Sequence, residues 1–462
     1  MVVSTLIANG TVVTAVGQYN ADILIESGRI AQLGTNLNAP GAARIDATGM
    51  YVLPGAIDPH THFDTPFGGK YTTVDDWHTG TIAAACGGTT TVVDFALQTK
   101  GQSLRQAIDG WHTKADGKAV IDYGFHAMVQ DLTDSVRLEI PAMIDEGIPS
   151  FKVFMAYKGG VQTDDETLLR TMFLAREHGG LTMVHAENGD AIVVVQERLA
   201  AEGKLAPVYW ALARPPELEA EATHRAIVLA KLAQTPLYVV HVSNGLAAAE
   251  ISRARGEGQP VFGETCPQYL MLSVENLEEP NGAGAKYVCA PPLRTKEHRD
   301  AMWRALANGT LQAVGTDHSA WLFKGMKDQS LNDFRGIING MPGVEERLFI
   351  LFTYGVLTGR LSLTQFVDIT ATAPAKLFGL YPRKGDIAIG TDADLVLWDP
   401  KKEWTLRVGD MHSNVDYCVY EGLPVTGWPA LVLSRGEVIA RDRKFAGKSG
   451  GGEFLRRQRF PV

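Results

Sequence analysis

The segment YVLPGAIDPHTH, residues 51–62, is the first of eight similar units in the middle of the chain. It begins with an apolar run typical of a strand buried on both faces, and it ends with two histidines. The other units also begin with a short apolar, β-branched run and continue into a helix-like stretch. The eight runs are 51–57, 90–95, 123–129, 151–154, 181–184, 237–240, 260–262 and 311–315. Strands and helices alternating in this way predict an α/β fold, a (β/α)8 TIM barrel whose site lies where the strands end.

The two ends of the chain differ from the middle and contain short strands with tight turns. Asn9-Gly10 and Ser27-Gly28 supply turns near the N-terminus, and short apolar runs return at 394–398, 415–420, 430–434 and 438–440. This pattern predicts a second, smaller β-sandwich domain formed from both termini. The predicted boundaries are 1–54 and 381–442 for the two parts of the sandwich, 55–380 for the catalytic barrel and 443–462 for a C-terminal tail. The arginines of this tail are expected to be solvated: Arg456, Arg457 and Arg459.

The composition is that of an ordinary globular protein. With 462 residues, 45% of them apolar, the chain is long enough for a barrel and a smaller companion domain. A net charge of −9 argues against a nucleic-acid partner. No apolar run approaches the roughly 20 residues of a membrane helix, and no signal peptide is visible. Cys86, Cys266, Cys289 and Cys418 form no CxxC pair, so we expect reduced cysteines in the core of a cytoplasmic protein.

Metal-binding side chains fall at the ends of the predicted barrel strands. His60 and His62 follow the first strand, and residues two apart in an extended segment project to the same side. His185, His241 and Asp317 come at the ends of the fifth, sixth and eighth strands. Any one of these alone is more often a hydrogen-bonded histidine or a helix-capping aspartate. Together they predict a metal centre. Because five ligands exceed what one catalytic ion needs, two divalent ions fit better, and zinc suits this ligand set.

Lys152 interrupts the apolar fourth strand, in SFKVFM at 150–155. A buried ammonium without a partner carries a large desolvation cost. Two interpretations follow from the residues alone. The lysine either extends its ammonium to the barrel mouth, or its neutral amine reacts with carbon dioxide. The second reaction would give a carbamate anion with two oxygens, which could bridge two cations.

Several motifs, in order along nearly the whole chain, resemble those of one enzyme family. They are HTHFD at 60–64 with PFGG at 66–69, SFKVFMAY at 150–157, HAENGD at 185–190, RPP at 214–216 with EAEAT at 219–223, GETCPQYL at 263–270, TDH at 316–318, FGLYPRKG at 378–385 and DADLV at 392–396. On these residues the chain resembles the hydantoinases and dihydropyrimidinases of the metal-dependent amidohydrolase superfamily, and among them the bacterial D-hydantoinases.

The resemblance implies a role for each residue of the metal centre. The ligands of one zinc ion would be His60, His62, Lys152 carbamylated to N6-carboxylysine, and Asp317, and those of the other would be Lys152, His185 and His241. Manganese or cobalt would also suit these ligands. A hydroxide bridging the two ions would attack the ring carbonyl. Asp317 would take its proton and pass it to the departing nitrogen, and Tyr157 would donate a hydrogen bond to the developing oxyanion.

The resemblance also implies how the substrate is held. Main-chain groups near Ala290 and near the Asn339-Gly340 pair would bind the planar imide edge of the ring. Many relatives have serine where this chain has Ala290, so any contribution of that hydroxyl is absent here. Thr65 is small and polar where some relatives have a bulky apolar residue. The candidates for the wall around the exocyclic substituent are Phe63, Thr65, Phe67, Leu97, Phe154, Tyr157 and Val161.

The expected activity is hydrolysis of the cyclic amide bond of 5-substituted hydantoins and dihydropyrimidines, giving N-carbamoyl amino acids. Dihydroorotases usually have Leu-Arg, whose arginine binds a free carboxylate, where this chain has Phe63-Asp64, so an acidic ring is disfavoured. The alternatives are an allantoinase-type hydrolase of cyclic ureides and a non-catalytic scaffold of the same fold, although all six ligand positions are kept. Relatives are commonly homotetramers. We therefore expect a homotetramer that binds a small cyclic imide and neither nucleic acid nor membrane.

Overall fold

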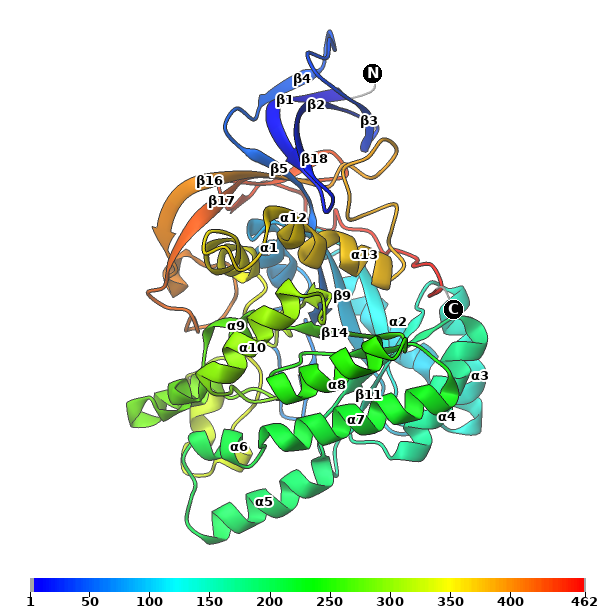
Figure 1. The fold of residues 1–462 in the computed structure, drawn as a ribbon, viewed down its shortest axis with the longest axis vertical. Coiled ribbons are helices and arrows are strands. Elements are labelled where there is room, and N and C mark those ends of the chain that lie inside the picture. Colours follow the sequence, from blue (N-terminus) through cyan, green and yellow to red (C-terminus); the bar gives the residue numbers. More distant parts are fainter. Residues whose placement is uncertain (1–3, 461–462) are drawn as a thin grey trace.

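The computed structural model describes residues 4–460, which form a barrel and a smaller sheet (Figure 1). Eight parallel strands follow the order β15-β14-β13-β12-β11-β10-β9-β6, which confirms the predicted barrel. They are β6 Ala56–Thr61, β9 Thr89–Leu97, β10 Asp122–Met128, β11 Ser150–Phe154, β12 Leu181–His185, β13 Leu237–Val239, β14 Val261–Thr265 and β15 Ala313–Val314. A parallel bridge between Thr61 and His318 joins β6 to the segment after β15, so the barrel is nearly closed.

Helices cover the outer side of the barrel (Figure 1). The longer ones are α1 Thr79–Cys86, α2 Leu104–Ala115, α3 Asp134–Asp145, α4 Asp165–His178, α5 Gly189–Ala201, α7 Pro216–Ala233, α8 Gly245–Gly256 and α10 Lys296–Ala307. The shorter segments are α6 Val208–Leu212, α9 Pro267–Met271, α11 Arg347–Ile350, α12 Leu363–Val367, α13 Ala373–Leu377, η1 Val274–Glu278, η2 Pro280–Tyr287, η3 Lys327–Ser330, η4 Phe334–Gly336, η5 Leu351–Val356, η6 Asp368–Thr372 and η7 Val408–Asp410. No helix among residues 4–460 is long and apolar enough to cross a membrane.

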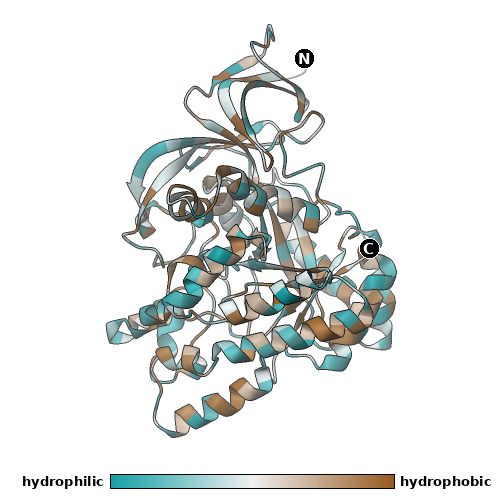
Figure 2. Cartoon of the chain, viewed as in Figure 1, coloured by the Kyte–Doolittle hydropathy of each residue, from teal (hydrophilic) through white to brown (hydrophobic). Residues whose placement is uncertain are grey.

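The burial of the strands explains their apolar sequences. Every residue of β6, β10, β11 and β12 is buried, because helices cover one face and side chains fill the barrel interior. Hydrophilic residues, teal in Figure 2, lie mainly on the helices and the sheet at the surface. All four cysteines are buried and unpaired. Several helices begin where a side chain accepts a hydrogen bond from a main-chain N–H. These caps are Ser103, Thr133, Asp164, Asn188 and Asn244.

Strands from both ends of the chain form one mixed sheet, which confirms the smaller β-domain. Its path is β19-β18-β17-β16-β5-β1-β2-β3, with β4 paired to β1. The strands are β1 Ser4–Val13, β2 Gln18–Glu26, β3 Arg29–Gly34, β4 Ala43–Asp46, β5 Tyr51–Pro54, β16 Leu395–Thr405, β17 Pro424–Ser434, β18 Glu437–Arg441 and β19 Lys444–Phe445. A two-stranded hairpin, β7 Pro66–Phe67 with β8 Tyr71–Thr72, lies apart from it. The antiparallel pairing of β5 with β16 joins the two ends of the chain.

Two predicted strands differ in the structure. The run 51–57 is not one strand, because β5 belongs to the mixed sheet and β6 to the barrel. Gly55 lies between them, and a Cβ atom there would be 2.1 Å from Oγ1 of Thr90, so the chain passes too close to β9 for a larger residue. The run 415–420 forms turns rather than a strand, although Tyr417 and Cys418 are buried.

The C-terminal tail packs against the barrel. Main-chain hydrogen bonds join Tyr123 N to Glu453 O at 3.0 Å and Leu455 N to Tyr123 O at 2.7 Å. The predicted solvation of the arginines is wrong for Arg457, which is 4% exposed. Its guanidinium donates to Ser150 Oγ at 2.8 Å and to the carbonyl of Phe125. Asp122 and Ser150 are the first residues of β10 and β11, so the contacts of the tail with Tyr123 and Ser150 place it at the amino ends of these strands. The predicted site lies at the opposite end of the barrel.

Candidate active site

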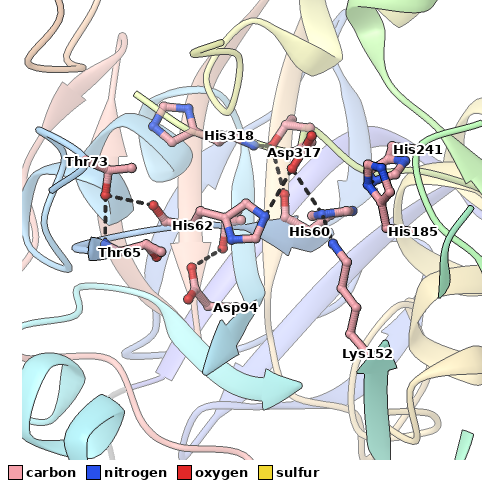
Figure 3. A network of polar contacts seen from close by, with 12 residues as sticks. His60, His62, Thr65, Thr73, Asp94, Lys152, His185, His241, Asp317 and His318 are labelled. Atoms are coloured by element: carbon pink, nitrogen blue, oxygen red, sulfur yellow. Dashed lines mark hydrogen bonds and ion pairs between the residues drawn. The ribbon is translucent and has the colours of Figure 1, made fainter. Parts of the chain in front are cut away.

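The six predicted ligand residues come together at the carboxyl ends of the barrel strands (Figure 3). Each is carried by a different part of the barrel, apart from the histidine pair. His60 lies in β6 and His62 directly follows it, Lys152 is in the middle of β11, His185 ends β12, His241 follows β13, and Asp317 follows β15. The strand order places β6 and β15 at opposite ends of the sheet path, and closure of the barrel is what brings Asp317 beside the two histidines.

Short distances link the side chains of this centre. Oδ1 of Asp317 lies 3.1 Å from Nε2 of His60 and 3.1 Å from Nε2 of His62. Nδ1 of His185 faces Nε2 of His241 at 2.9 Å. The ligand atoms of His60, His241 and Asp317 lie within 4.8 Å of one another, which makes this group a candidate metal site.

Carboxylates behind the histidines orient the imidazole rings. Nδ1 of His60 donates to Glu264, and Nε2 of His185 donates to Oε2 of Glu187 at 2.8 Å. With each of these N–H groups directed away from the centre, the other ring nitrogen can offer a lone pair to a cation bound there. Among the described residues, Nδ1 of His241 has no hydrogen-bond partner. The donor set therefore suits divalent cations that accept nitrogen and oxygen ligands.

The protonation states of His62, His185 and Asp317 agree with this donor set. Burial lowers the pKa of His62 to about 4 and also lowers the pKa of His185, so both imidazoles are neutral near pH 7. Burial acts to raise the pKa of Asp317, but His60 and His62 outweigh it and hold that pKa well below its usual value. Burial and the charge of Lys152 act to lower the pKa of His60, but Asp317 and Glu264 outweigh them and raise it. The centre thus offers neutral imidazoles at His62 and His185 and an ionised carboxylate at Asp317.

Lys152 points its amine into the same centre. The residue is 1% exposed, which excludes the interpretation that its ammonium extends into solvent at the barrel mouth. Nζ lies 3.1 Å from Nε2 of His60 and 4.1 Å from the ring centroid of Phe95. Burial lowers the pKa of Lys152 to about 8. A considerable fraction of the amine is therefore neutral and nucleophilic at mildly alkaline pH.

A cavity of about 300 Å³ opens above the centre. Its floor contains His62, Lys152, His185, His241 and Asp317. The predicted wall residues that line it are Thr65, Phe67, Leu97, Phe154, Tyr157 and Val161. Phe63 does not line it, because its ring is fully buried between Trp77 and His318. Pro66, Gly68, Met128, Gly160, Ser319 and Trp321 also line the cavity and were not predicted. Most of this lining is apolar, which suits an apolar substituent.

The residues predicted to bind the reacting ring are also at this cavity. Ala290, Asn339 and Gly340 line it. The Tyr157 hydroxyl donates to Oδ1 of Asn339 at 3.2 Å, and burial raises the pKa of Tyr157, so the hydroxyl stays protonated and can donate. Tyr157 has a φ of +73° and Asp317 a φ of +51°. Such strained non-glycine residues gather at functional sites, where the fold can hold them.

Buried acids that support the centre had no predicted role. Glu264 and Glu187 contact ligand histidines as described above. Asp58 accepts from His60 N at 3.1 Å and from Thr316 Oγ1 at 2.6 Å, and so connects β6 to the segment that carries Asp317. A signal was present, because Asp58 and Glu187 each stand two residues from a predicted ligand. Their partners, however, depend on the closure of the barrel.

Comparisons with known proteins agree with one another. The Amidohydrolase family matches residues 51–439. A D-hydantoinase of Geobacillus stearothermophilus is 55% identical to this chain over 98% of the chain and 97% of that protein. The crystal structure of a dihydropyrimidinase from Brevibacillus agri NCHU1002 is 52% identical, with a TM-score of 0.98, over 99% of this chain and 100% of that one. A crystal structure of a D-hydantoinase is 53% identical, with a TM-score of 0.98, over the same shares.

Proposed function

The chain belongs to the hydantoinase and dihydropyrimidinase family of amidohydrolases, and from this premise we propose that it opens the rings of D-5-substituted hydantoins and of dihydropyrimidines. The products would be N-carbamoyl amino acids. The observation that carries the proposal is the convergence of four histidines, Asp317 and Lys152 at a cavity with an apolar wall, whose floor includes all of these residues except the fully buried His60.

Two divalent cations, Zn²⁺ in the first place and Mn²⁺ or Co²⁺ as alternatives, would complete the centre. The ligands proposed for one are His60, His62, Lys152 and Asp317, and those for the other are Lys152, His185 and His241. When bound, the cations would make water nucleophilic at neutral pH and polarise the ring carbonyl. Glu264 and Glu187 bind the outer ring nitrogens of His60 and His185, which leaves the inner nitrogens free to bind a cation. These contacts support the assignment.

Lys152 would take part as a carbamate. Its neutral Nζ attacks the carbon of CO2, a C–N bond forms, and the amine proton leaves to solvent. The resulting carbamate would offer two oxygens as ligands for divalent cations. It would also remove the unfavourable buried ammonium. The pKa of about 8 and the position between His60 and the rings of Phe95 and Phe154 support this modification.

The chain's own residues then move protons and stabilise charge. Asp317 accepts the proton of the attacking water and delivers it to the ring nitrogen as the amide bond breaks. Tyr157 donates its hydroxyl proton in a hydrogen bond to the carbonyl oxygen as negative charge develops there. Main-chain groups of the Ala290 and Asn339 segments hold the imide edge.

The wall of the cavity selects the substituent at ring position 5. Leu97, Phe154 and Trp321 offer apolar and aromatic surface, which favours alkyl and aryl substituents and excludes water from the reacting bond. The polar ureido group of allantoin would lose hydrogen bonds to water there. The same surface therefore disfavours the allantoinase alternative.

One set of assays tests the proposal. Zinc-loaded protein is assayed with both enantiomers of phenylhydantoin, with dihydrouracil and with allantoin, and bound metal is measured by mass spectrometry. We expect ring opening of the D enantiomer and of dihydrouracil, with about two metal ions per chain. Lys152→Ala should lose both metal and activity, whereas Lys231→Ala, at an exposed lysine of α7, should lose neither. The proposal fails if metal-loaded protein opens none of these rings.

The homotetramer and the cytoplasmic location stay predictions. Exposed apolar residues on the outer helices, Val194 of α5 and Val228 and Leu232 of α7, support an assembly. Brown segments on these helices are visible in Figure 2. Mass photometry of purified protein would show a mass of about four chains, and a monomer at micromolar concentration would contradict the prediction.

A further inference from the structure

Lys327 is a fully buried lysine with no part in the chemistry described above. It begins η3 and is 0% exposed. Its Nζ donates hydrogen bonds to two main-chain carbonyls, that of Val288 at 3.0 Å and that of Ile338 at 2.9 Å. An apolar residue such as methionine would fill this place without the desolvation cost of an amine. What the amine provides is therefore the pair of bonds to the two carbonyls.

These carbonyls belong to two segments that are distant in the sequence. Val288 lies two residues before Ala290, and Ile338 directly precedes Asn339-Gly340. Ala290, Asn339 and Gly340 line the cavity, and Lys327 binds their segments from behind. A hydrogen bond from Gly340 N to Val288 O at 3.0 Å also joins the two segments.

Other side chains each hold only one of the two segments. Trp210 Nε1 donates to the Cys289 carbonyl at 2.7 Å and the Tyr269 hydroxyl to the Pro291 carbonyl at 2.6 Å, in the Ala290 segment. Trp321 Nε1 donates to the Asn339 carbonyl at 3.0 Å, and the Tyr157 hydroxyl donates to the Asn339 side chain. Within the part of the chain that the structure describes, Lys327 is the side chain whose amine bonds to both segments. The distance between the segments thus depends on Lys327 together with the main-chain bond from Gly340 to Val288.

We propose that Lys327 is a positioning residue, which sets the spacing between the Ala290 and Asn339 segments and thereby the binding of the planar imide edge. The identity of the ring rests on the proposed function, whereas the spacing is a property of the chain itself. Hydrogen bonds weaken steeply when they are stretched or bent, so a ring held by both segments tolerates little change in their spacing. Lys327 contacts none of the six proposed ligands, so its loss should affect ring binding far more than the chemical step.

Lys327→Met keeps the length of the side chain and removes both bonds. In the zinc-loaded variant we expect KM for dihydrouracil and phenylhydantoin to rise about tenfold or more, since the Ile338 carbonyl loses the bond from Lys327 and the Val288 carbonyl keeps only the bond from Gly340 N–H. The value of kcat should stay within about threefold, and the zinc content should not change. Lys384→Met is the matched control. Lys384 is equally buried but binds Asp122 and Asp394 near the other end of the barrel, so this variant should lose thermal stability and keep its KM.

A crystal structure of Lys327→Met supplies a second measurement that does not depend on activity. We expect the Val288 and Ile338 carbonyls to move apart. An unchanged KM, a fall in kcat alone, or an unchanged spacing would each overturn the proposal. Should Lys327→Met not fold, Lys327→Gln retains an N–H donor and should raise KM by a smaller factor, and a wild-type KM would be contrary evidence. If wild-type protein opens no cyclic amide, the proposed function fails, while the spacing in the variant still decides the role of Lys327.

Discussion

Replacing Glu264 with glutamine removes a negative charge behind the candidate metal centre while keeping the size of the side chain. Glu264 is 0% exposed on β14. One carboxylate oxygen accepts from Nδ1 of His60, and the other accepts from the Tyr238 hydroxyl at 3.0 Å. The charge makes the opposite nitrogen of His60 a stronger ligand, and the hydrogen bond holds the ring in the required tautomer. Glutamine can still accept from His60 through its amide oxygen, so Glu264→Gln should leave the fold intact and weaken the ligand.

The expected loss is about 10- to 100-fold in zinc affinity, the usual effect of changing such a partner. This factor corresponds to about 1.4–2.7 kcal/mol. The assay equilibrates the protein against zinc buffers of graded free concentration, then measures bound metal and ring opening in the same samples. We expect activity to recover when zinc is raised. The control is Glu250→Gln, which alters a carboxylate that binds His224 at 2.9 Å on the surface. Zinc affinity equal to that of the wild type would refute the reasoning.

Three further changes test other parts of the molecule. Tyr157→Phe removes the hydroxyl proposed to stabilise the oxyanion and should lower kcat by about 100- to 1,000-fold, with bound metal unchanged; a kcat near that of the wild type would exclude this role. Leu455→Ala, in the tail, empties a place that is 1% exposed and should lower the free energy of unfolding by about 2–5 kcal/mol without changing kcat; calorimetry showing an unchanged Tm would contradict the packing of the tail. Folding lowers the pKa of His62 from 6.5 to about 4. Between these two pH values the unfolded chain binds a proton at His62 and the folded chain does not. The stability of metal-free protein should therefore fall as the pH decreases through that window, by up to about 3 kcal/mol, and His62→Gln should flatten this part of a urea-unfolding profile; identical profiles would count against it.

The sequence predicted the barrel well because the strands carry their own signal. Runs such as 181–184 and 237–240 are apolar on both faces, and this property depends only on neighbouring residues. The tail shows the opposite case. Arg457 looks like a solvated residue in a basic cluster, yet it is buried against Phe125, which is 332 residues away. The neighbouring residues in the sequence give no indication of a contact across such a separation. The burial of Arg457 can therefore be recognised only in the folded structure.

The metal-centre residues and the carboxylates around them differ in the same way. Ligands such as His185 could be located because strand ends converge in any barrel. The role of Glu264 depends on which of several buried groups it meets. Its two partners, His60 and Tyr238, lie on different strands, β6 and β13. Their meeting depends on side-chain orientation inside the closed barrel, which neither composition nor spacing encodes.

Phe63 does not line the cavity, contrary to the prediction, and the alternation of side chains along the preceding segment explains why. His60 and His62 reach the site because alternate residues of an extended chain project to the same side. By the same rule Thr61 and Phe63 project to the other side. The structure agrees, since Thr61 Oγ1 donates to Asp94 at 2.8 Å, Phe63 N donates to the same carboxylate at 2.9 Å, and the Phe63 ring is buried away from the cavity. The alternation ends at Asp64, whose φ of +49° takes the chain out of the extended conformation. Thr65 therefore lines the cavity although it is an odd-numbered position like Thr61 and Phe63. The period of two sorts residues 60–63 into those that face the metal centre and those that face the core.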